Sequence, residues 1–559
     1  MSFDPSRYRA PARVHLPDRQ WPNRALERAP TWCSVDLRDG NQALPDPMGH
    51  ERKRALLQLL LAVGFEHIEL GFPAASQTDF DFIRWAIASG VLGERVIPQV
   101  ITQARQELIA RTFDSILGAK RAIVHLYNST SELQRRVVFG KSKREILELA
   151  VQGTRWVKAE AEAAALAGTE VTFQYSPESF TGTELDYALE VCEAVVEAWD
   201  PSPERPLILN LPTTVEMTTP NVYADRIEWF DRQLKRRESV ILSLHTHNDR
   251  GTGVACAELG LLAGATRVEG TLLGNGERSG NVDIVTLALN LYSHGVDPGL
   301  VFTDLPELVR VVEECTKLPV HPRHPYAGEL VFTAFSGSHQ DAIHKGQKAM
   351  EASDGRIYEV PYLPIDPADV GRGYEPVIRI NSQSGKSGIA HVLERDFGLR
   401  LPRPLAVELS REVQVRTDAS GEEYSAGATV ALFRSTYVDV AGPLAFESAN
   451  TDRQSGGARC TVAARLNLRG KVQEVQGTGA GPIEAFVTAL SECVGTELTL
   501  CDYSEHGVSE GASARAVAYV SLRSATTTQR YYGVSEHEDV VLASFRAIIS
   551  AYNRLDRCS

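Results

Sequence analysis

The sequence has no excess of positive charge. Its 559 residues carry 58 Lys and Arg against 72 Asp and Glu, which gives a formal net charge of -14 at pH 7. Proteins that bind nucleic acid neutralise its phosphates with clustered Lys and Arg. The charge balance therefore argues against a nucleic-acid partner, although it does not exclude a local basic groove for a smaller phosphate compound.

Paired cysteines and long apolar runs are also lacking. The eight cysteines are scattered without a C-x-x-C pair, which favours reduced thiols over a disulfide framework or a zinc ribbon. The N-terminal region carries Asp4 and Arg7 and lacks the apolar stretch of a secretory signal. The longest apolar segment, near Leu56–Phe65, is too short to cross a bilayer. We therefore expect a cytoplasmic protein with no membrane partner.

Eight β-rich runs are present between residues 31 and 295, each followed by a helix-like stretch. In Arg52–Val63 the leucines fall on one helical face, and Gly64 follows as a C-cap. Eight βα units in roughly 265 residues match an α/β fold of the (β/α)8 TIM barrel type. A doubly wound open sheet is the alternative, but it normally has a glycine-rich turn after its first strand, and residues 38–42 read RDGNQ. The predicted strands are Thr31–Leu37, His67–Gly71, Val96–Thr102, Arg121–Tyr127, Glu170–Tyr175, Leu207–Leu211, Val240–Leu244 and Arg267–Leu273.

The pattern changes after Pro319, as expected for a chain too long for one core. We predict a barrel over residues 12–328, a linking region over 329–440 and a small C-terminal α+β domain over 441–559. This last domain looks like two similar halves. Its predicted strands are Arg459–Leu468, Glu497–Tyr503 and Ala514–Leu522, and its predicted helices lie near Pro482–Val494 and Asp539–Leu555.

Polar side chains gather at the ends of the predicted barrel strands, where barrel active sites lie. His245 and His247 are two residues apart on a strand, so both imidazoles point to the same side. With the Asp39 carboxylate they form a mixed nitrogen and oxygen set that suits Zn, Mn, Co or a similar divalent ion. Asn281 is a candidate for a fourth ligand. The alternative is that both histidines are polar lumen residues hydrogen-bonded to their neighbours.

Arg38 and Glu178 are candidate catalytic groups. Arg38 keeps its charge and presents a fixed fork of donors, so beside a metal it could polarise a ketone oxygen. Its other interpretation is a structural ion pair with Glu69 or Asp39. Glu178 is either a general base or a group that orients a ligand. The glycine-rich segment Gly274–Asn281 is expected to end where a helix begins, so that its amides could meet an anion.

Several segments resemble the 2-isopropylmalate synthase family, which belongs to a larger group of aldolase-like barrels with homocitrate, citramalate and hydroxymethylglutaryl-CoA enzymes. The resemblance spans nearly the whole chain and is nearest to the longer, bacterial form. Its most specific parts are FSGSHQDAI (335–343) and VPYLPIDPADVGRGYE (360–375). The other matching segments are LRDGNQAL (37–44), IELGFPAASQTDFDF (68–82), HLYNSTSELQRRVVF (125–139), YSPESFTGTELDYA (175–188), LPTTVEMTTPNVYAD (211–225), LSLHTHNDRGTGVA (242–255), LGNGERSGN (273–281) and NSQSGKSG (381–388).

The resemblance implies a reaction, in which the acetyl group of acetyl-CoA is joined to 2-oxoisovalerate and the product thioester is hydrolysed. It also implies that Arg38 stabilises the enolate or alkoxide oxygen and that Glu178 assists proton transfer. The implied ligands of a divalent Mg, Mn or Zn ion are Asp39, His245, His247 and Asn281. The implied 2-oxoacid pocket consists of Arg38, His125, Ser176 and Asn210, with Thr214 holding the carboxylate.

The resemblance further implies a homodimer with shared active sites, because His339 and Tyr362 would reach the barrel of a neighbouring subunit. The terminal domain resembles a leucine-sensing domain, which makes leucine an implied effector. The implied regulatory residues are Gly477, Gly479, Gly481 and Tyr503. The glycines precede a helix whose N-terminus could take a carboxylate, but G-x-G-x-G also fits a tight turn. The chain departs from the W-G-V-G-type stretch usual in the family, since residues 531–538 read YYGVSEHE, and the added acidic groups put leucine feedback in doubt.

Three other functions are compatible with parts of this pattern. A sister synthase for another oxoacid, such as citramalate or homocitrate synthase, would differ mainly in pocket size, and one methylene is worth about 1–3 kcal/mol. A homocitrate synthase would also need a cation for a distal carboxylate, and none is obvious. A lyase is disfavoured by the terminal domain and by SGSHQDAI. A non-catalytic metal-binding or amino-acid-sensing protein is disfavoured by the joint presence of Arg38, Glu178, His339 and Tyr362.

Overall fold

The computed structural model forms two compact units. The first comprises Met1–Val331 with Ile365–Arg372, and the second comprises Phe332–Pro364 with Gly373–Ser559. The residues that the structure describes are 4–7, 11–334, 336–353, 357–373, 389–390, 393–394, 397–420, 426–453, 459–508, 515–525, 527 and 529–558. The segment NSQSGKSG (381–388), which carries part of the family resemblance, lies outside them.

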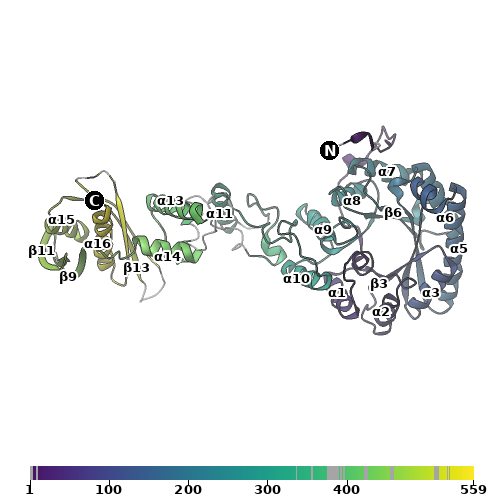
Figure 1. Ribbon diagram of the computed structural model, residues 1–559, viewed down its shortest axis with the longest axis horizontal. Helices are drawn as coiled ribbons and strands as arrows, with labels where there is room; N and C mark the ends of the chain where they lie inside the picture. The colour runs from purple at the N-terminus through teal and green to yellow at the C-terminus, as the bar shows by residue number, and fades with distance from the viewer. Residues whose placement is uncertain are drawn as a thin grey trace. The chain divides into compact units, whose positions relative to one another are not determined.

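The first unit is a closed parallel barrel in which β1 to β8 follow one another in sequence order (Figure 1). The predicted (β/α)8 fold is therefore confirmed. The strands are β1 (Thr31–Ser34), β2 (His67–Gly71), β3 (Ile97–Gln103), β4 (Arg121–Ser129), β5 (Glu170–Glu178), β6 (Leu207–Thr213), β7 (Val240–Thr246) and β8 (Arg267–Gly270). The helices are α1 (His50–Val63), α2 (Gln77–Ala88), α3 (Gln106–Ile116), α4 (Glu132–Gln134), α5 (Lys143–Leu166), α6 (Leu185–Trp199), α7 (Pro220–Gln233), α8 (Gly253–Leu262), α9 (Ile284–Ser293) and α10 (Leu305–Thr316).

Short helical turns follow several strands at the carboxyl end of the barrel. They are η3 (Asp36–Gly40) and η4 (Arg135–Phe139), both π-helical, and the 3-10 turns η5 (Phe180–Gly182) and η7 (Leu272–Gly274). The first of these corrects a prediction, because β1 was expected to continue to Leu37 and instead ends at Ser34. The amides of Asp39 and Gly40 both bond to the carbonyl of Val35, which turns the chain into the barrel mouth. The last strand also ends early, at Gly270 rather than Leu273.

The C-terminal part of the second unit consists of two similar halves, as predicted. Each half is a three-stranded antiparallel sheet followed by one helix. The first half is β9 (Leu444–Arg453), β10 (Cys460–Leu468), β11 (Lys471–Gly479) and α15 (Pro482–Val494), and the second is β12 (Leu498–Gly507), β13 (Ala516–Ser524), β14 (Tyr531–His537) and α16 (Val540–Cys558). The sequence analysis missed β9, β11 and β14. In β11 most side chains are exposed or half-buried, so the strand lacks the apolar alternation that reveals a strand.

In the sequence, α10 and β9 are separated by α11 (Gly337–Glu351), the 3-10 turn η8 (Pro367–Val370), α13 (Arg403–Ser420) and α14 (Ala426–Tyr437). Within the second unit, α13 and α14 are tied to the second sheet half. Arg554 of α16 pairs with Glu408 of α13 at 2.8 Å, and Val438, just after α14, forms a parallel bridge with Val534 of β14. These two helices are therefore packed on the terminal domain.

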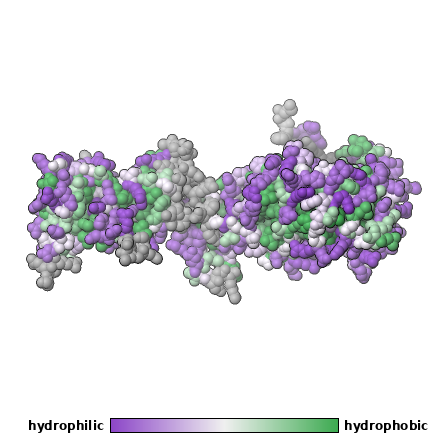
Figure 2. All heavy atoms as spheres, turned by 90° about the horizontal axis from the view of Figure 1, so that it is seen from below, coloured by the Kyte–Doolittle hydropathy of each residue, from purple (hydrophilic) through white to green (hydrophobic). Residues whose placement is uncertain are grey.

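Among the described helices, none is long and apolar enough to span a bilayer. Figure 2 shows hydrophilic residues over much of the visible face of the barrel, with apolar areas between them. The barrel interior is unusual in the opposite sense, because it holds charged and amide side chains that are fully buried, among them Gln99, Arg267 and Glu269. Buried charges persist only when they are paired and hydrogen-bonded. These side chains therefore form a bonded layer inside the barrel, next to the strand ends.

Candidate active site

One pocket of about 290 Å³ lies at the carboxyl ends of the barrel strands. Strand ends in this fold carry the functional side chains because the helices cover the rest of the barrel. The lining residues are Arg38, Asp39, Gln42, Phe72, Ile101, His125, Tyr127, Ser176, Glu178, Asn210, Pro212, Thr214, His245, His247, Glu277 and Arg278. The structure thus brings nine of the predicted site residues together, although their positions span 210 residues of sequence.

Asp39, His245 and His247 form a cluster that could hold a metal ion. One possible ligand atom from each lies within 4.8 Å of the other two. Oδ2 of Asp39 is 3.1 Å from Nε2 of His245 and 3.8 Å from Nε2 of His247. Nδ1 of His247 is 3.2 Å from the carbonyl of Gly280, which can only accept, so this nitrogen carries the hydrogen and Nε2 presents its lone pair to the cluster.

Asn281, the fourth predicted ligand, lies beside this cluster. It forms an antiparallel bridge with His247, and its Nδ2 bonds to the carbonyl of Asn275 at 3.3 Å. Its Oδ1 is buried and has no hydrogen-bond partner in the described part of the chain. Gly276 makes room for this side chain, since a Cβ there would lie 2.4 Å from Nδ2 of Asn281. A buried acceptor without a donor is unusual in a native protein.

The three residues of the cluster have strongly shifted pKa values, because they are buried close to one another and to other charges. Burial would raise the pKa of Asp39, but the Arg38 guanidinium and the hydrogen bond from His245 hold that pKa far below its usual range. Burial opposes protonation of His245, but its hydrogen bonds to Asp39 and Glu269 raise the pKa of this histidine to about 9. For His247, burial and the neighbouring His245 charge lower the pKa to about 4. Asp39 is therefore anionic and His247 neutral at pH 7, which are the states that bind metals, whereas His245 is protonated and must release its Nε2 hydrogen, which bonds to Asp39, when an ion binds.

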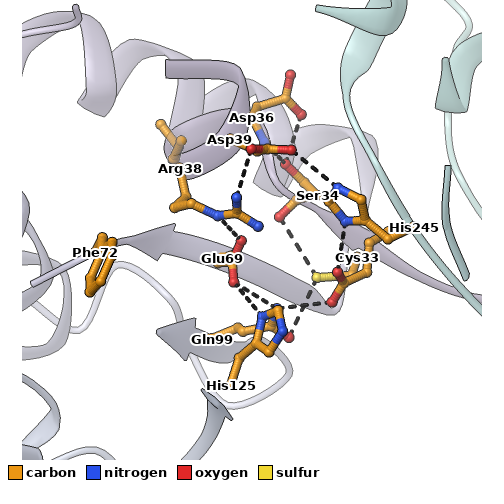
Figure 3. A network of polar contacts seen from close by, with 12 residues as sticks. Cys33, Ser34, Asp36, Arg38, Asp39, Glu69, Phe72, Gln99, His125 and His245 are labelled. Atoms are coloured by element: carbon orange, nitrogen blue, oxygen red, sulfur yellow. Dashed lines mark hydrogen bonds and ion pairs between the residues drawn. The ribbon is translucent and has the colours of Figure 1, made fainter. Parts of the chain in front are cut away.

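Arg38 lies on η3 with its guanidinium between two carboxylates (Figure 3). Nη1 is 2.7 Å from Oδ1 of Asp39, and Nε bonds to Oε2 of Glu69. Burial would lower the pKa of Arg38, but the two carboxylates outweigh burial and hold this pKa above its ordinary value. Both interpretations of Arg38 are compatible with this geometry, because the side chain is ion-paired and also lines the pocket.

The predicted 2-oxoacid residues form a hydrogen-bonded chain. Nε2 of His125 is 2.7 Å from Oγ of Ser176, and Nδ2 of Asn210 donates to the same oxygen at 3.1 Å. Nδ1 of His125 is 3.0 Å from Oε1 of Glu69, a contact drawn as a dashed line in Figure 3. Glu69 therefore holds Arg38 on one side and His125 on the other.

Glu178 and Thr214 lie on neighbouring strand ends. The hydroxyl of Ser129 donates to Oε2 of Glu178, and the backbone N–H of Ser179 donates to Oγ1 of Thr214 at 2.8 Å. Arg226 supports this region from α7 by donating to the carbonyls of Phe180 and Thr181 at 3.0 and 3.1 Å. Apolar side chains of Phe72, Ile101, Tyr127 and Pro212 complete the wall of the pocket.

The glycine-rich segment corrects one prediction. Helix α9 begins at Ile284, three residues beyond Asn281, and its N-cap is Asp283, which accepts a hydrogen bond from the amide of Val285 at 3.0 Å. The helix N-terminus is therefore already occupied by a carboxylate. The loop instead contributes Glu277 and Arg278 to the pocket mouth, where Arg278 pairs with Asp249 at 2.6 Å.

Sequence reasoning missed the residues that support the site. Ser129, Gln99, Arg267 and Glu269 were not singled out, although all four lie within the barrel strands. The available signal was a charged pair two residues apart in the predicted strand segment RVEG (267–270), which points both charges to the same side of a strand.

His339 and Tyr362 belong to the second unit. Their rings stack with centroids 3.9 Å apart at 23°, and the Tyr362 side chain is exposed. Tyr362 has φ of +66°, which is uncommon for a residue with a side chain. Their predicted contribution to a neighbouring subunit stays a prediction.

The predicted regulatory glycines have a packing role. A Cβ at Gly477 would lie 2.2 Å from the carbonyl of Ala485, and one at Gly479 would lie 2.6 Å from its amide, so both let α15 pack closely on β11. Gly481 is the N-cap of α15, and the amide of Ala480 is already bound by Oε2 of Glu484 at 2.7 Å.

In the other half of the domain, Gly533 has the same packing role against α16. Tyr503 is hydrogen-bonded to Glu505 and, at 2.9 Å, to Ser544. The regulatory role of Tyr503 and of the three glycines stays a prediction.

Comparison with known proteins adds an independent observation. Residues 29–312 match the HMGL-like family model, residues 329–394 match the alpha-isopropylmalate synthase post-catalytic domain-like model, and residues 423–556 match the LeuA allosteric (dimerisation) domain. The chain is 54% identical over 557 residues to the 2-isopropylmalate synthase of Rhodospirillum rubrum, which covers 99% of this chain and 100% of that protein. It is 55% identical over 555 residues to the 2-isopropylmalate synthase of a Parafrankia species, covering 99% of this chain and 97% of that one.

Proposed function

This chain belongs to the 2-isopropylmalate synthase family, and we propose that its barrel joins the acetyl group of acetyl-CoA to 2-oxoisovalerate and hydrolyses the thioester, as an acyltransferase of leucine biosynthesis. The observation that carries the proposal is the meeting of Asp39, His245 and His247 with Arg38 in a single pocket that also has an apolar wall. Such a pocket suits a small, branched oxoacid, because it combines charge for one end with apolar contact for the other.

Asp39, His245, His247 and Asn281 would hold a divalent ion. Oδ1 of Asn281 and the Nε2 lone pair of His247 support this set, because within the described part of the chain neither acceptor receives a hydrogen bond. Three ligand types, carboxylate, imidazole and amide oxygen, suit Mg, Mn or Zn. When bound, the ion supplies Lewis-acid polarisation of the keto and carboxylate oxygens of the oxoacid.

Arg38 would act on the oxygen where negative charge develops. Two of its donors are held by Asp39 and Glu69, so the guanidinium is fixed before substrate arrives. Pre-oriented donors in a partly dry site stabilise a developing oxyanion more than mobile ones, because little reorganisation is needed. Two N–H groups on Nη2 and one on Nη1 of Arg38 remain to donate to an enolate or alkoxide oxygen.

Thr214 would hold the oxoacid carboxylate. Its oxygen already accepts from the amide of Ser179, so its own hydroxyl hydrogen remains available to donate. His125, Ser176 and Asn210 would contact the other polar atoms of the oxoacid, and the isopropyl group would lie against Phe72, Ile101 and Tyr127. An oxoacid with a second, distal carboxylate is less well suited to this pocket, because Arg278 at the mouth is already bound to Asp249 and to the carbonyl of Thr214.

Glu178 would assist proton transfer together with His339 and Tyr362 from a second copy of the chain. The match to a dimerisation domain over residues 423–556 supports a homodimer. Leucine is proposed as the effector of that domain, and the departure in residues 531–538 favours weak feedback. A cytoplasmic location stays a prediction.

The test is release of CoA from acetyl-CoA by the purified chain with 2-oxoisovalerate, pyruvate or 2-oxoglutarate. We expect a strong preference for 2-oxoisovalerate that a chelator abolishes and a divalent ion restores. A preference for pyruvate or 2-oxoglutarate would instead assign a sister synthase of the citramalate or homocitrate type. Addition of leucine to the same assay measures whether the terminal domain inhibits.

A further inference from the structure

Glu269 is a carboxylate of the barrel interior that receives hydrogen bonds from several strands. It lies on β8 and is fully buried. Oε1 accepts hydrogen bonds from Gln99 at 2.9 Å, Gln174 at 2.7 Å and Arg267 at 2.8 Å. Oε2 lies 3.0 Å from Nδ1 of His245 and accepts from Nδ2 of Asn210, also at 3.0 Å. Five donors thus converge on one side chain below the pocket.

This arrangement fixes which nitrogen of His245 faces the cluster. An ionised carboxylate can only accept, so Nδ1 of His245 keeps its hydrogen. The Arg267 guanidinium and the side-chain amides of Gln99, Gln174 and Asn210 all donate to Glu269, and donors of this kind favour the ionised carboxylate. Glu269 therefore stays ionised, and only Nε2 of His245 can act as a ligand.

We propose that Glu269 is a positioning residue that sets the tautomer and ring orientation of His245 and, through Asn210, joins the metal side of the pocket to the oxoacid side. The proposal rests on the metal site of the proposed function. It goes beyond that site because Glu269 itself does not line the pocket.

The layer below Glu269 cannot easily rearrange. Arg267 donates through Nη2 to Oε1 of Gln99 at 2.9 Å and through Nη1 to Ser243 at 2.8 Å. The amide of Gln99 is therefore oriented, and its Nε2 donates to both Glu69 and Glu269, at 3.0 and 2.9 Å. Figure 3 shows Gln99 beside His125 and below Glu69 in the view. One amide thus separates two carboxylates that would otherwise repel each other.

The Glu269→Gln variant tests the tautomer directly. The NH2 group of the new glutamine must replace either Oε1 or Oε2, and at either position it would face donors that it cannot accept from. Three donors, including Arg267, face the Oε1 position, whereas two face Oε2. The NH2 therefore faces His245, which must then accept at Nδ1 and carry its hydrogen on Nε2. That hydrogen competes with a metal ion for the same lone pair.

The measurement is the Zn²⁺ dissociation constant of the full chain, by competition with a chromogenic chelator. We expect Glu269→Gln to weaken Zn²⁺ binding by about 10- to 100-fold, the usual effect of removing such a partner. The matched control is Glu216→Gln, another buried glutamate, which accepts from the amide of Arg250 and the hydroxyl of Thr252. It should bind Zn²⁺ as the unaltered chain does.

A charge-preserving variant covers the case in which Glu269→Gln does not fold. Glu269→Asp keeps the negative charge that pairs with Arg267, so this variant should fold. Its shorter side chain withdraws the carboxylate from His245, so it should bind Zn²⁺ more weakly than the unaltered chain. The visible spectrum of bound Co²⁺ should change in either variant, because the orientation of the His245 ligand changes. Unaltered Zn²⁺ affinity in a folded Glu269 variant would overturn the proposal. If the unaltered chain and Asp39→Asn bind Zn²⁺ equally poorly, the metal site of the proposed function fails instead.

Discussion

The backbone N–H of Ser179 donates a 2.8 Å hydrogen bond to Oγ1 of Thr214 across two neighbouring barrel strands. Ser179 adopts a left-handed conformation with φ of +61°, which costs free energy in a residue with a side chain. Arg226 contributes to holding this conformation by binding the two carbonyls that follow Ser179. The Thr214 oxygen therefore already accepts one hydrogen bond, and its hydroxyl hydrogen can still donate into the pocket.

Thr214→Val should therefore weaken use of the oxoacid, because it removes a hydrogen bond to a carboxylate while keeping the side-chain shape. A hydrogen bond to a charged group is worth about 1.5–3 kcal/mol, which corresponds to a loss of roughly 10- to 150-fold in kcat/KM. Thr214→Ser keeps the hydroxyl and should retain most activity. Steady-state kinetics with 2-oxoisovalerate decide the matter, and equal kcat/KM in the valine and serine variants would remove Thr214 from the site.

Arg38→Lys should lower kcat by about 100- to 1000-fold, since a lysine keeps the charge but cannot hold Asp39 and Glu69 with two separate donors. Zn²⁺ binding should change much less than kcat. Arg52→Lys is the control, because Arg52 pairs with Asp46 outside the pocket. A kcat near that of the control would leave Arg38 with the structural interpretation alone.

Ser129 and Glu178 should act as one unit, because the Ser129 hydroxyl donates to Oε2 of Glu178. We expect Ser129→Ala to reduce kcat by roughly 10- to 150-fold, in keeping with loss of one hydrogen bond to a charged group. The same change in a Glu178→Gln background should have little further effect, because the carboxylate it orients is gone. Additive losses in the double variant would show that the two residues act independently.

Shared active sites predict complementation between inactive variants. Asp39→Asn disables the barrel, and His339→Ala disables the residue expected from a second copy. In mixed dimers one site in two is intact, so dimers purified through both tags should show about half of the unaltered activity, and an unselected random mixture about a quarter. The measurement is CoA release by the two variants co-expressed with different affinity tags and purified through both. Activity no higher than that of the separate variants would mean that each barrel uses its own His339, or none.

Asp36 predicts a pH dependence of stability. Burial raises the pKa of this carboxyl to about 7, although hydrogen bonds from Ser34 and from the amide of Leu272 lower it. The folded pKa lies above the unfolded value, so the folded chain holds the proton more tightly. The contribution of Asp36 to stability is then greatest below about pH 4, decreases as the pH rises to about 7, and changes little above that value.

Asp36→Asn removes this titration and can keep the hydrogen bond from Leu272. Relative to the unaltered chain it should gain on the order of 4 kcal/mol in the free energy of unfolding between pH 4 and pH 8. Urea unfolding of the barrel at several pH values measures the difference. A difference that stays constant with pH would contradict the raised pKa.

The sequence by itself determined the barrel, because eight buried parallel strands read as apolar runs at regular intervals. His67–Gly71 and Pro482–Val494 were predicted with the bounds that the structure has. It also indicated the cluster of Asp39 with His245 and His247, since strand-end positions in a barrel converge whatever their separation in sequence.

Only the tertiary structure decided the remaining features. The π-helical turn after Ser34 depends on where Val35 and Leu37 are buried, and apolar pattern cannot separate that turn from one more pair of strand residues. The glycines at 477 and 479 read equally well as a ligand loop until α15 is placed on β11. The role of Glu269 is the clearest case, because its five donors come from five different strands. No local pattern records such a meeting, since it exists only once the barrel closes.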